Sequence, residues 1–154
     1  FAGPLISVYM EFKLLTGLRR GDILSLKLSQ IKDDGIHAYI SKSKKTQIFA
    51  WTDALELAVK NIKKLDRPVK GFYLFITKKG QPYTGSGFAS IWQRKMRAAL
   101  EEGIITDRFR EHDLRAKTAS DTNLQHASNL LAHGDERTTK RVYMRKSKIV
   151  MPLR

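Results

Sequence analysis

The sequence predicts a mainly α-helical fold with a small antiparallel β-sheet, which makes it an α+β domain. An apolar run over residues 5–16 has helical character and stops at Gly17, a residue type that commonly ends helices. Residues 35–41 and 46–51 are rich in strand formers and flank a basic turn, which predicts a β-hairpin. A longer helix is predicted over residues 86–102, before Gly103. The 154 residues are 42% hydrophobic, enough for one core, so we expect a single domain over residues 1–154.

Helix caps and chain breakers predict the remaining elements. A short helix is expected over residues 22–28, and Thr52 is expected to cap a helix that runs from residue 53 to about residue 65. Pro68 and Gly71 interrupt the chain before a short buried strand over residues 72–77. Three further helices are predicted over residues 112–121, 124–132 and 137–143, followed by a basic tail over residues 145–154. The layout is therefore mostly helical after the early hairpin.

The chain is strongly basic. Lysine and arginine total 29 against 15 acidic residues, which gives a net charge of +14. This excess favours a polyanionic partner, and nucleic acid before an anionic membrane. The sequence contains no cysteine, which excludes a disulfide scaffold, a thiolate zinc site and a cysteine nucleophile. Because no apolar run approaches the ~20 residues of a membrane span, we expect a cytoplasmic protein with no membrane partner.

Groups able to cleave a phosphodiester gather in the last third of the sequence. His112 and Arg115 are three residues apart and so share one face of a helix. His133 follows an apolar helix, and Tyr143 lies ten residues further on. A metal-free cut needs a nucleophile, cations around the phosphate oxygens and a proton source for the leaving oxygen. Any one of these residues alone is more often structural, because such His–Arg pairs usually lie at surfaces or caps and single tyrosines usually pack.

Five motifs follow one another along the sequence. They are TGLR at residues 16–19, a basic hairpin around residues 42–45, HDLR at residues 112–115, LLAHG at residues 130–134 and TTKRVY at residues 138–143. The series, which spans residues 12–145, resembles the catalytic domain of the tyrosine recombinases, or phage integrase family. The resemblance implies the DNA breaking-rejoining fold of that family. It also implies that the chain is a fragment of a longer integrase, without its N-terminal DNA-binding domains.

The resemblance implies a role for each matched residue. Arg19 and Arg115 are expected to hold the scissile phosphate, and Tyr143 is expected to attack phosphorus. Lys42 is expected to be the general acid toward the leaving 5′-oxygen. His112 is expected to assist proton transfer and phosphate binding, and His133 to donate a hydrogen bond to the transition state. Asp22 is expected to support the helix that carries the first arginine rather than to react. The implied reaction needs no cofactor, metal or ATP, because the phosphotyrosyl bond keeps the energy of the bond that is cut.

The resemblance also implies the partners. They are double-stranded DNA and further copies of the chain, assembled as a homotetramer on DNA with weak or no self-association alone. The implied setting is the nucleoid of a bacterial cell or of a phage-infected host. Such a site-specific recombinase would serve DNA integration.

The match leaves two candidates for the catalytic lysine. Lys42 has the best spacing before the next helix, and Lys44 is the second candidate for the general acid. Ala132 replaces the glycine that is usual before His133, a mild change because alanine is a good helix former. Four other lysines are expected to be helix-surface charges: Lys13, Lys27, Lys63 and Lys64.

Other functions fit part of the sequence. A non-catalytic DNA-binding module, such as a regulator or a decayed integrase, explains the charge but gives no reason for the ordered series of motifs. A metal-dependent nuclease lacks support, since the sequence has no HExxH motif and no evident acidic cluster. A type IB topoisomerase shares the chemistry, but the short chain and the integrase-like motifs favour recombination.

Overall fold

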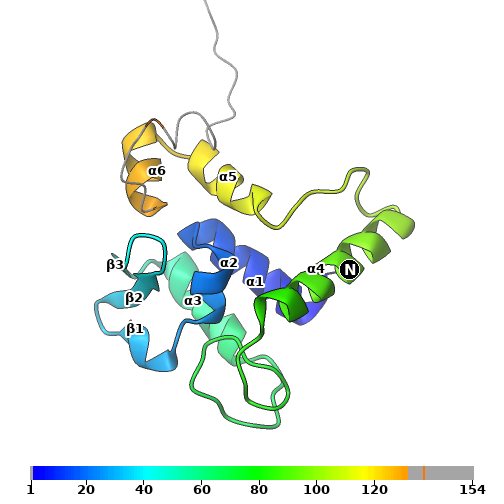
Figure 1. The fold of residues 1–154 in the computed structure, drawn as a ribbon, viewed down its shortest axis with the longest axis horizontal. Helices are drawn as coiled ribbons and strands as arrows, with labels where there is room; N and C mark the ends of the chain where they lie inside the picture. Colours follow the sequence, from blue (N-terminus) through cyan, green and yellow to red (C-terminus); the bar gives the residue numbers. More distant parts are fainter. Residues whose placement is uncertain (1, 132–136, 138–154) are drawn as a thin grey trace, which may run out of the picture.

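The computed structural model describes residues 2–131 and residue 137, and it has the predicted mixed architecture. The helices are α1 (Gly3–Thr16), α2 (Arg20–Leu24), the short 3-10 helix η1 (Leu28–Gln30), α3 (Asp53–Lys63), α4 (Gly85–Glu101), α5 (Asp113–Ser120) and α6 (Leu124–Leu130). The strands are β1 (Ile31–Lys32), β2 (Gly35–Ile40) and β3 (Lys45–Phe49), which form one antiparallel sheet in that order. The α+β fold class is therefore confirmed (Figure 1).

The core is built around α1. Tyr9 and Phe12 on this helix are both fully buried. The Tyr9 ring centroid lies 4.3 Å from that of Phe88 and 5.6 Å from that of Phe75, which joins α1 to α4 and to the loop before it. Aromatic contacts of this kind add to the stabilisation that burial of the rings already supplies. Trp92 on α4 is also buried.

The β2–β3 hairpin forms where the alternating segments predict it. Its register pairs Ile36 with Phe49 and Ile40 with Lys45, so the basic segment makes the turn. Lys44 has a φ of 54°, which is the left-handed conformation that closes this turn. The short β1 strand, which adds a third strand on the far side of β2, was not predicted.

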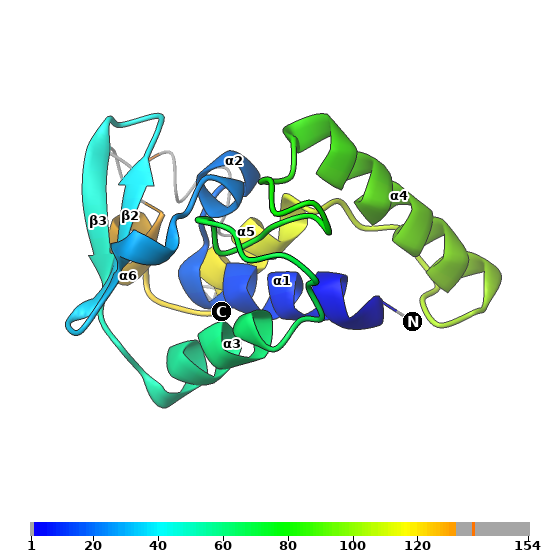
Figure 2. The same cartoon turned by 90° about the horizontal axis from the view of Figure 1, so that it is seen from below.

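Two helices from the C-terminal part of the chain lie against this body. Figure 1 shows α5 and α6 together on one side of α1, α2 and α3, while the hairpin and α4 lie at opposite ends, as Figure 2 also shows. The Thr118 hydroxyl donates to the Leu14 carbonyl at 2.9 Å, which fixes α5 on α1. The Gln47 side chain donates to the Asn129 carbonyl at 3.0 Å, which connects β3 with α6. These contacts bring the TGLR segment, the hairpin and the HDLR segment to one side of the molecule.

Three predictions need correction. Residues 72–77 form no named strand, because their pairing is limited to the isolated bridges Lys27–Tyr73 and Ile76–Pro82, although Phe75 is buried as expected. The second helix begins at residue 20 and ends at residue 24, and η1 follows it. Lys13 is fully buried rather than a surface charge, whereas the other three lysines of that group are exposed.

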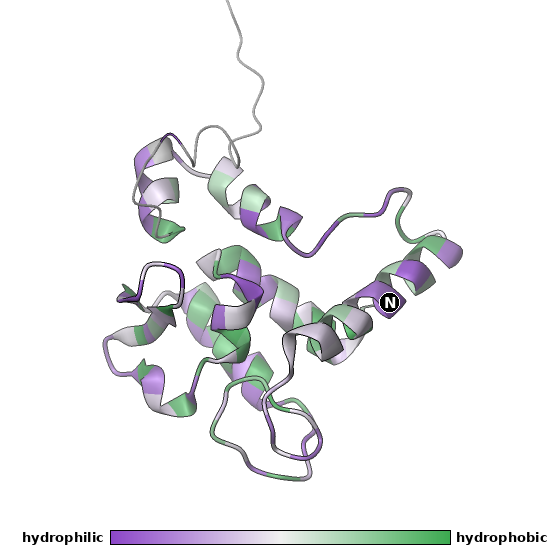
Figure 3. Cartoon of the chain, viewed as in Figure 1, coloured by the Kyte–Doolittle hydropathy of each residue, from purple (hydrophilic) through white to green (hydrophobic). Residues whose placement is uncertain are grey.

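Two further predictions fall outside the described residues, namely the helix over residues 137–143 beyond its first residue and the tail over residues 145–154. No helix within the described part of the chain is long and apolar enough to span a bilayer. Figure 3 shows that hydrophilic residues dominate the segment that joins α4 to α5, which leads into the site.

Candidate active site

A tight turn at the end of α1 presents Arg19. Gly17 follows the helix with a φ of 62°, and its amide donates to the Lys13 carbonyl at 2.7 Å. A side chain at Gly17 would be strained in this conformation, and its Cβ would lie 2.7 Å from a methyl carbon of Leu131. Arg19 then adopts an extended conformation directly before α2, with its side chain half-buried. The end of α1 and the start of α2 therefore fix the backbone position of Arg19.

The guanidinium of Arg115 lies beneath this turn. Arg115 belongs to α5 and is 1% exposed. It donates from Nη1 to the Gly17 carbonyl and, at 2.6 Å, from Nη2 to the Leu131 carbonyl. Hydrogen bonds from a charged donor are stronger than neutral ones, and in a buried setting water does not compete with them. Arg115 therefore joins α5 to the turn before Arg19 and to the end of α6.

His112 directly precedes α5 and lines the same cavity as Arg19. Partial desolvation of its ring lowers the pKa of His112 below the ordinary value of 6.5. The charges of Lys13, Arg115 and Arg19 lower this pKa further, and the Glu111 carboxylate opposes them. The lowered pKa favours the neutral form of the imidazole.

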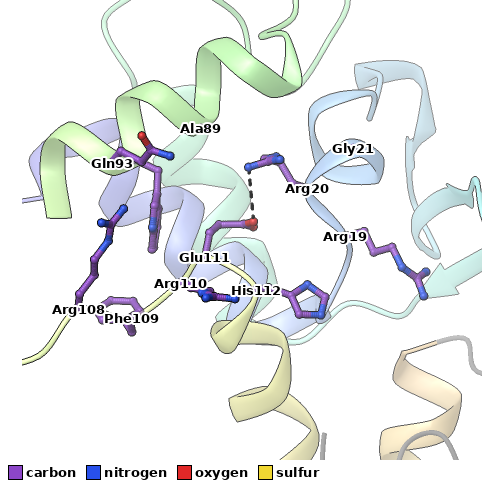
Figure 4. A pocket seen from close by; sticks show the side chains of 11 residues that line it. Arg19, Arg20, Gly21, Ala89, Gln93, Arg108, Phe109, Arg110, Glu111 and His112 are labelled. Carbon is purple, nitrogen blue, oxygen red and sulfur yellow. Dashed lines mark ion pairs between the residues drawn. The ribbon is translucent and has the colours of Figure 1, made fainter. Parts of the chain in front are cut away.

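The cavity is strongly cationic. Its volume is about 510 Å³, and four arginines line it, namely Arg19, Arg20, Arg108 and Arg110. Figure 4 shows Arg19 and His112 toward one end and Arg108 toward the other. Glu111 is the one carboxylate among the described residues that line the cavity, and it is engaged with Lys13 at 2.6 Å. The excess of positive charge in a partly enclosed site attracts an anion such as a phosphate group.

The hairpin carries Lys42 on the edge of this region. Lys42 is exposed in the β2–β3 turn and does not line the cavity. The neighbouring Ser41 is fixed, because Asp22 Oδ1 accepts hydrogen bonds from the Ser41 amide at 3.1 Å and from its hydroxyl at 2.7 Å. Asp22 is 3% exposed. The carboxylate thus connects α2 with the residue that precedes Lys42.

The family follows from comparison with known proteins. The sequence model of the phage integrase family matches residues 6–149 of this chain. The chain belongs to the phage integrase family. This membership agrees with the resemblance of the ordered motifs to those of tyrosine recombinases. A comparison with curated proteins found no match.

Solved integrase structures share the fold of this family member. A lambda integrase (residues 75–356) dimer bound to a COC′ core site matches with a TM-score of 0.72 and 20% identity, over 94% of this chain and 54% of that one. XerA recombinase matches with a TM-score of 0.73 and 19% identity, over 94% and 54%. The lambda integrase catalytic core matches with a TM-score of 0.64 and 23% identity, over 82% and 81%. This integrase-family chain thus spans about half the length of the first two.

The predicted site residues are brought together to different extents. Arg19 and His112 share the cavity, and Arg115 lies behind it with its hydrogen bond to Gly17. Asp22 connects α2 with Ser41 of the hairpin, while Lys42 stands apart on the exposed turn. The two remaining predicted residues, His133 and Tyr143, lie outside the described residues.

Sequence reasoning missed a buried polar network beside the cavity. The Lys13 ammonium lies 2.6 Å from Glu111 Oε1, and the Tyr9 hydroxyl donates to the same oxygen at 2.6 Å. A signal was available, because Tyr9, Lys13 and Thr16 lie on one helical face, and Tyr9 and Thr16 are residues that a core accepts. A lysine on that face requires a buried partner, and Glu111 directly precedes the HDLR segment.

Proposed function

We propose that this chain is the catalytic part of a site-specific recombinase, which cuts and rejoins DNA through a 3′-phosphotyrosyl bond to Tyr143. The observation that carries the proposal is the cationic cavity that Arg19 and His112 share, with Arg115 hydrogen-bonded to the turn behind Arg19. A pentacoordinate phosphorus gains negative charge on its non-bridging oxygens, and prepositioned cations stabilise that charge without reorganisation. A cluster of this kind supplies the stabilisation that a metal ion supplies in other enzymes.

In the proposed reaction the Tyr143 phenol oxygen attacks phosphorus and the bond from phosphorus to the 5′-oxygen breaks. The phenol proton passes to the neutral His112 ring, and Lys42 gives a proton to the leaving 5′-oxygen. Arg19 and Arg115 offset the charge on the phosphate, and His133 donates a further hydrogen bond. The 5′-hydroxyl of another strand then attacks the phosphotyrosine and returns a proton to Lys42, while His112 returns its proton to the phenol oxygen as the bond to Tyr143 breaks, which rejoins the DNA. The number of phosphoester bonds is the same before and after, so no energy source is consumed.

The proposed substrate is double-stranded DNA, and the proposed assembly on it is a homotetramer. The net charge of +14 favours such a polyanion. Among the similar structures are a lambda integrase dimer bound to a COC′ core site and a lambda integrase tetramer bound to a Holliday junction. These complexes support the proposal by analogy of fold, at 20% sequence identity.

A nicked suicide substrate tests the proposal. A strand fragment that diffuses away after cleavage traps the covalent intermediate, so the wild-type chain should form an adduct that survives a denaturing gel and excess chelator. Tyr143→Phe should form none. Tyr39→Phe, which alters a tyrosine that is 51% exposed on the hairpin, is the matched control and should form the adduct normally.

Two results would contradict the proposal. DNA binding by the wild-type chain without any adduct would identify a non-catalytic DNA-binding module. Cleavage that disappears when a chelator is added would identify a metal-dependent nuclease.

A further inference from the structure

A buried ammonium group joins the two segments that carry Arg19 and His112. Lys13 is fully buried on α1, and its Nζ donates to the Leu18 carbonyl at 2.9 Å. The same nitrogen lies 2.6 Å from Glu111 Oε1. Leu18 directly precedes Arg19, and Glu111 directly precedes His112. The Lys13 ammonium is thus bonded both to the residue directly before Arg19 and to the residue directly before His112.

The Glu111 carboxylate is held from several directions. The Tyr9 hydroxyl donates to Oε1 at 2.6 Å, and Arg20 Nη1 lies 4.0 Å from Oε2. Burial, with the Glu111 charge, raises the pKa of Tyr9, so this phenol keeps its proton and remains a donor. Figure 4 shows the Glu111 side chain directed toward Arg20. The carboxylate is therefore fixed in both position and orientation.

Stability alone gives a poor reason for this arrangement. Burial lowers the pKa of Lys13, and the Glu111 carboxylate opposes that effect. An ion pair in such a place is often no more stabilising than well-packed apolar residues of the same volume, because both charges lose their hydration. What apolar residues cannot reproduce is directional bonding, since the ammonium holds a backbone carbonyl and a carboxylate in one geometry.

We propose that Lys13 and Glu111 are positioning residues, a buried clamp that sets the distance and orientation of Arg19 relative to His112. The inference rests on the proposed function, because it assigns these two residues to the same phosphate site. Consecutive Cα atoms are ~3.8 Å apart, so a movement at Leu18 or Glu111 passes almost directly to the adjoining residue. Lys13 and Glu111 do not touch the substrate in this proposal, and they act through Arg19 and His112.

The clamp predicts that catalysis and folding separate in a double variant. Lys13→Met with Glu111→Leu removes both charges together, so its stability in urea should fall only through the loss of partners for the Leu18 carbonyl and the Tyr9 hydroxyl, and the chain should still fold cooperatively. Its DNA affinity should change little. Its single-turnover rate on the suicide substrate should fall by about 100-fold, the effect typical of a displacement of about 1 Å at a reacting centre. Lys60→Met, at an exposed lysine of α3, is the matched control and should cleave at the wild-type rate.

Single variants at Lys13 provide a further test of the clamp. Lys13→Met alone leaves the Glu111 carboxylate without its ammonium partner at 2.6 Å and dependent on the Tyr9 hydroxyl and on Arg20 at 4.0 Å, so it should lose stability as well as rate. Lys13→Arg keeps the charge and its donors, so it should recover more of the cleavage rate than Lys13→Met. A folded double variant that cleaves as fast as the wild type would overturn the clamp.

A magnetic resonance measurement separates the clamp from the proposed function. In the 154-residue chain without DNA, the Arg19 Nε–Hε and His112 ring resonances should both shift in the double variant and stay unchanged in Lys60→Met. Unchanged resonances in the folded double variant would overturn the clamp even if cleavage were slow. If the wild type formed no covalent adduct, the proposed function would fail, and the resonances would still decide whether the clamp positions these two side chains.

Discussion

The two sides of the proposed site are held in different ways. On the side of α1 and α5, buried hydrogen bonds fix the turn before Arg19, from Lys13 to the Leu18 carbonyl and from Arg115 to the Gly17 carbonyl. On the side of the hairpin, Lys42 is exposed, and the attachment next to it is the bond between Ser41 and Asp22. The comparison indicates that the groups proposed to hold the phosphate are prepositioned by buried bonds, whereas the proposed general acid sits on an exposed turn.

The largest effect should come from the exposed side. Lys42→Met should lower the cleavage rate by about 100- to 10,000-fold, the usual contribution of a general acid. A substrate with sulfur in place of the bridging 5′-oxygen should restore the rate, because a thiolate leaves without a proton. Lys44→Met in the same turn is the matched control. If Lys44→Met showed the loss and the sulfur rescue instead, Lys44 would be the acid.

The buried side should show combined losses. Arg115→Leu should lower the cleavage rate by about 100- to 1000-fold through loss of a prepositioned charge. It should also destabilise the fold, since each buried carbonyl left without its donor costs about 1–3 kcal/mol. Urea denaturation and single-turnover cleavage measure the two effects. Arg97→Leu on the exposed face of α4 is the control, and equal behaviour of the two variants would remove Arg115 from the site.

Local sequence signals account for most of the fold. Gly17 ends α1 in the left-handed conformation, and Thr52 caps α3 by accepting from the Leu55 amide, because both effects are local. The apolar segment around Phe75 is buried without forming a strand, since burial of a short apolar run does not specify its pairing. Where pairing depends on a distant partner, the sequence pattern alone was insufficient.

The candidate site shows the same division between what local sequence signals predict and what depends on distant partners. The motifs predicted Arg19, His112 and Arg115, and the structure describes how the backbone holds each of them. Lys13 was expected on the surface because lysine seldom lies in a core. Its burial depends on Glu111, which is 98 residues away along the chain, and no local rule connects the two residues.

A smaller effect should follow from loosening the hairpin. Ser41→Ala removes the hydroxyl bond to Asp22 at 2.7 Å but keeps the amide bond at 3.1 Å. The free energy of unfolding should fall by about 1 kcal/mol, and the cleavage rate should fall much less than in Lys42→Met. Ser43→Ala in the same exposed turn is the control. A loss of rate as large as that of Lys42→Met would mean that the hairpin is prepositioned after all.

The smallest effect concerns pH. The pKa of His112 is lowered in the folded chain, so between that pKa and 6.5 the unfolded chain binds more protons than the folded one. Stability should therefore decrease as the pH falls through this window and should be fully present above it. His112→Gln should show a weaker decrease in urea denaturation between pH 7.5 and pH 5.5 than the wild type, with His126→Gln as control. An unchanged decrease would contradict the stated environment of the ring.

A double-mutant cycle on Arg19 and His112 tests the central claim most directly. Single-turnover cleavage of the suicide substrate is measured for Arg19→Ala, for His112→Ala and for the pair. Groups that grip one phosphate act as a unit, so the double variant should lose much less than the product of the two single losses. Losses that simply multiply would mean that the two side chains act on separate sites, and the account of a single phosphate-binding cavity would be wrong.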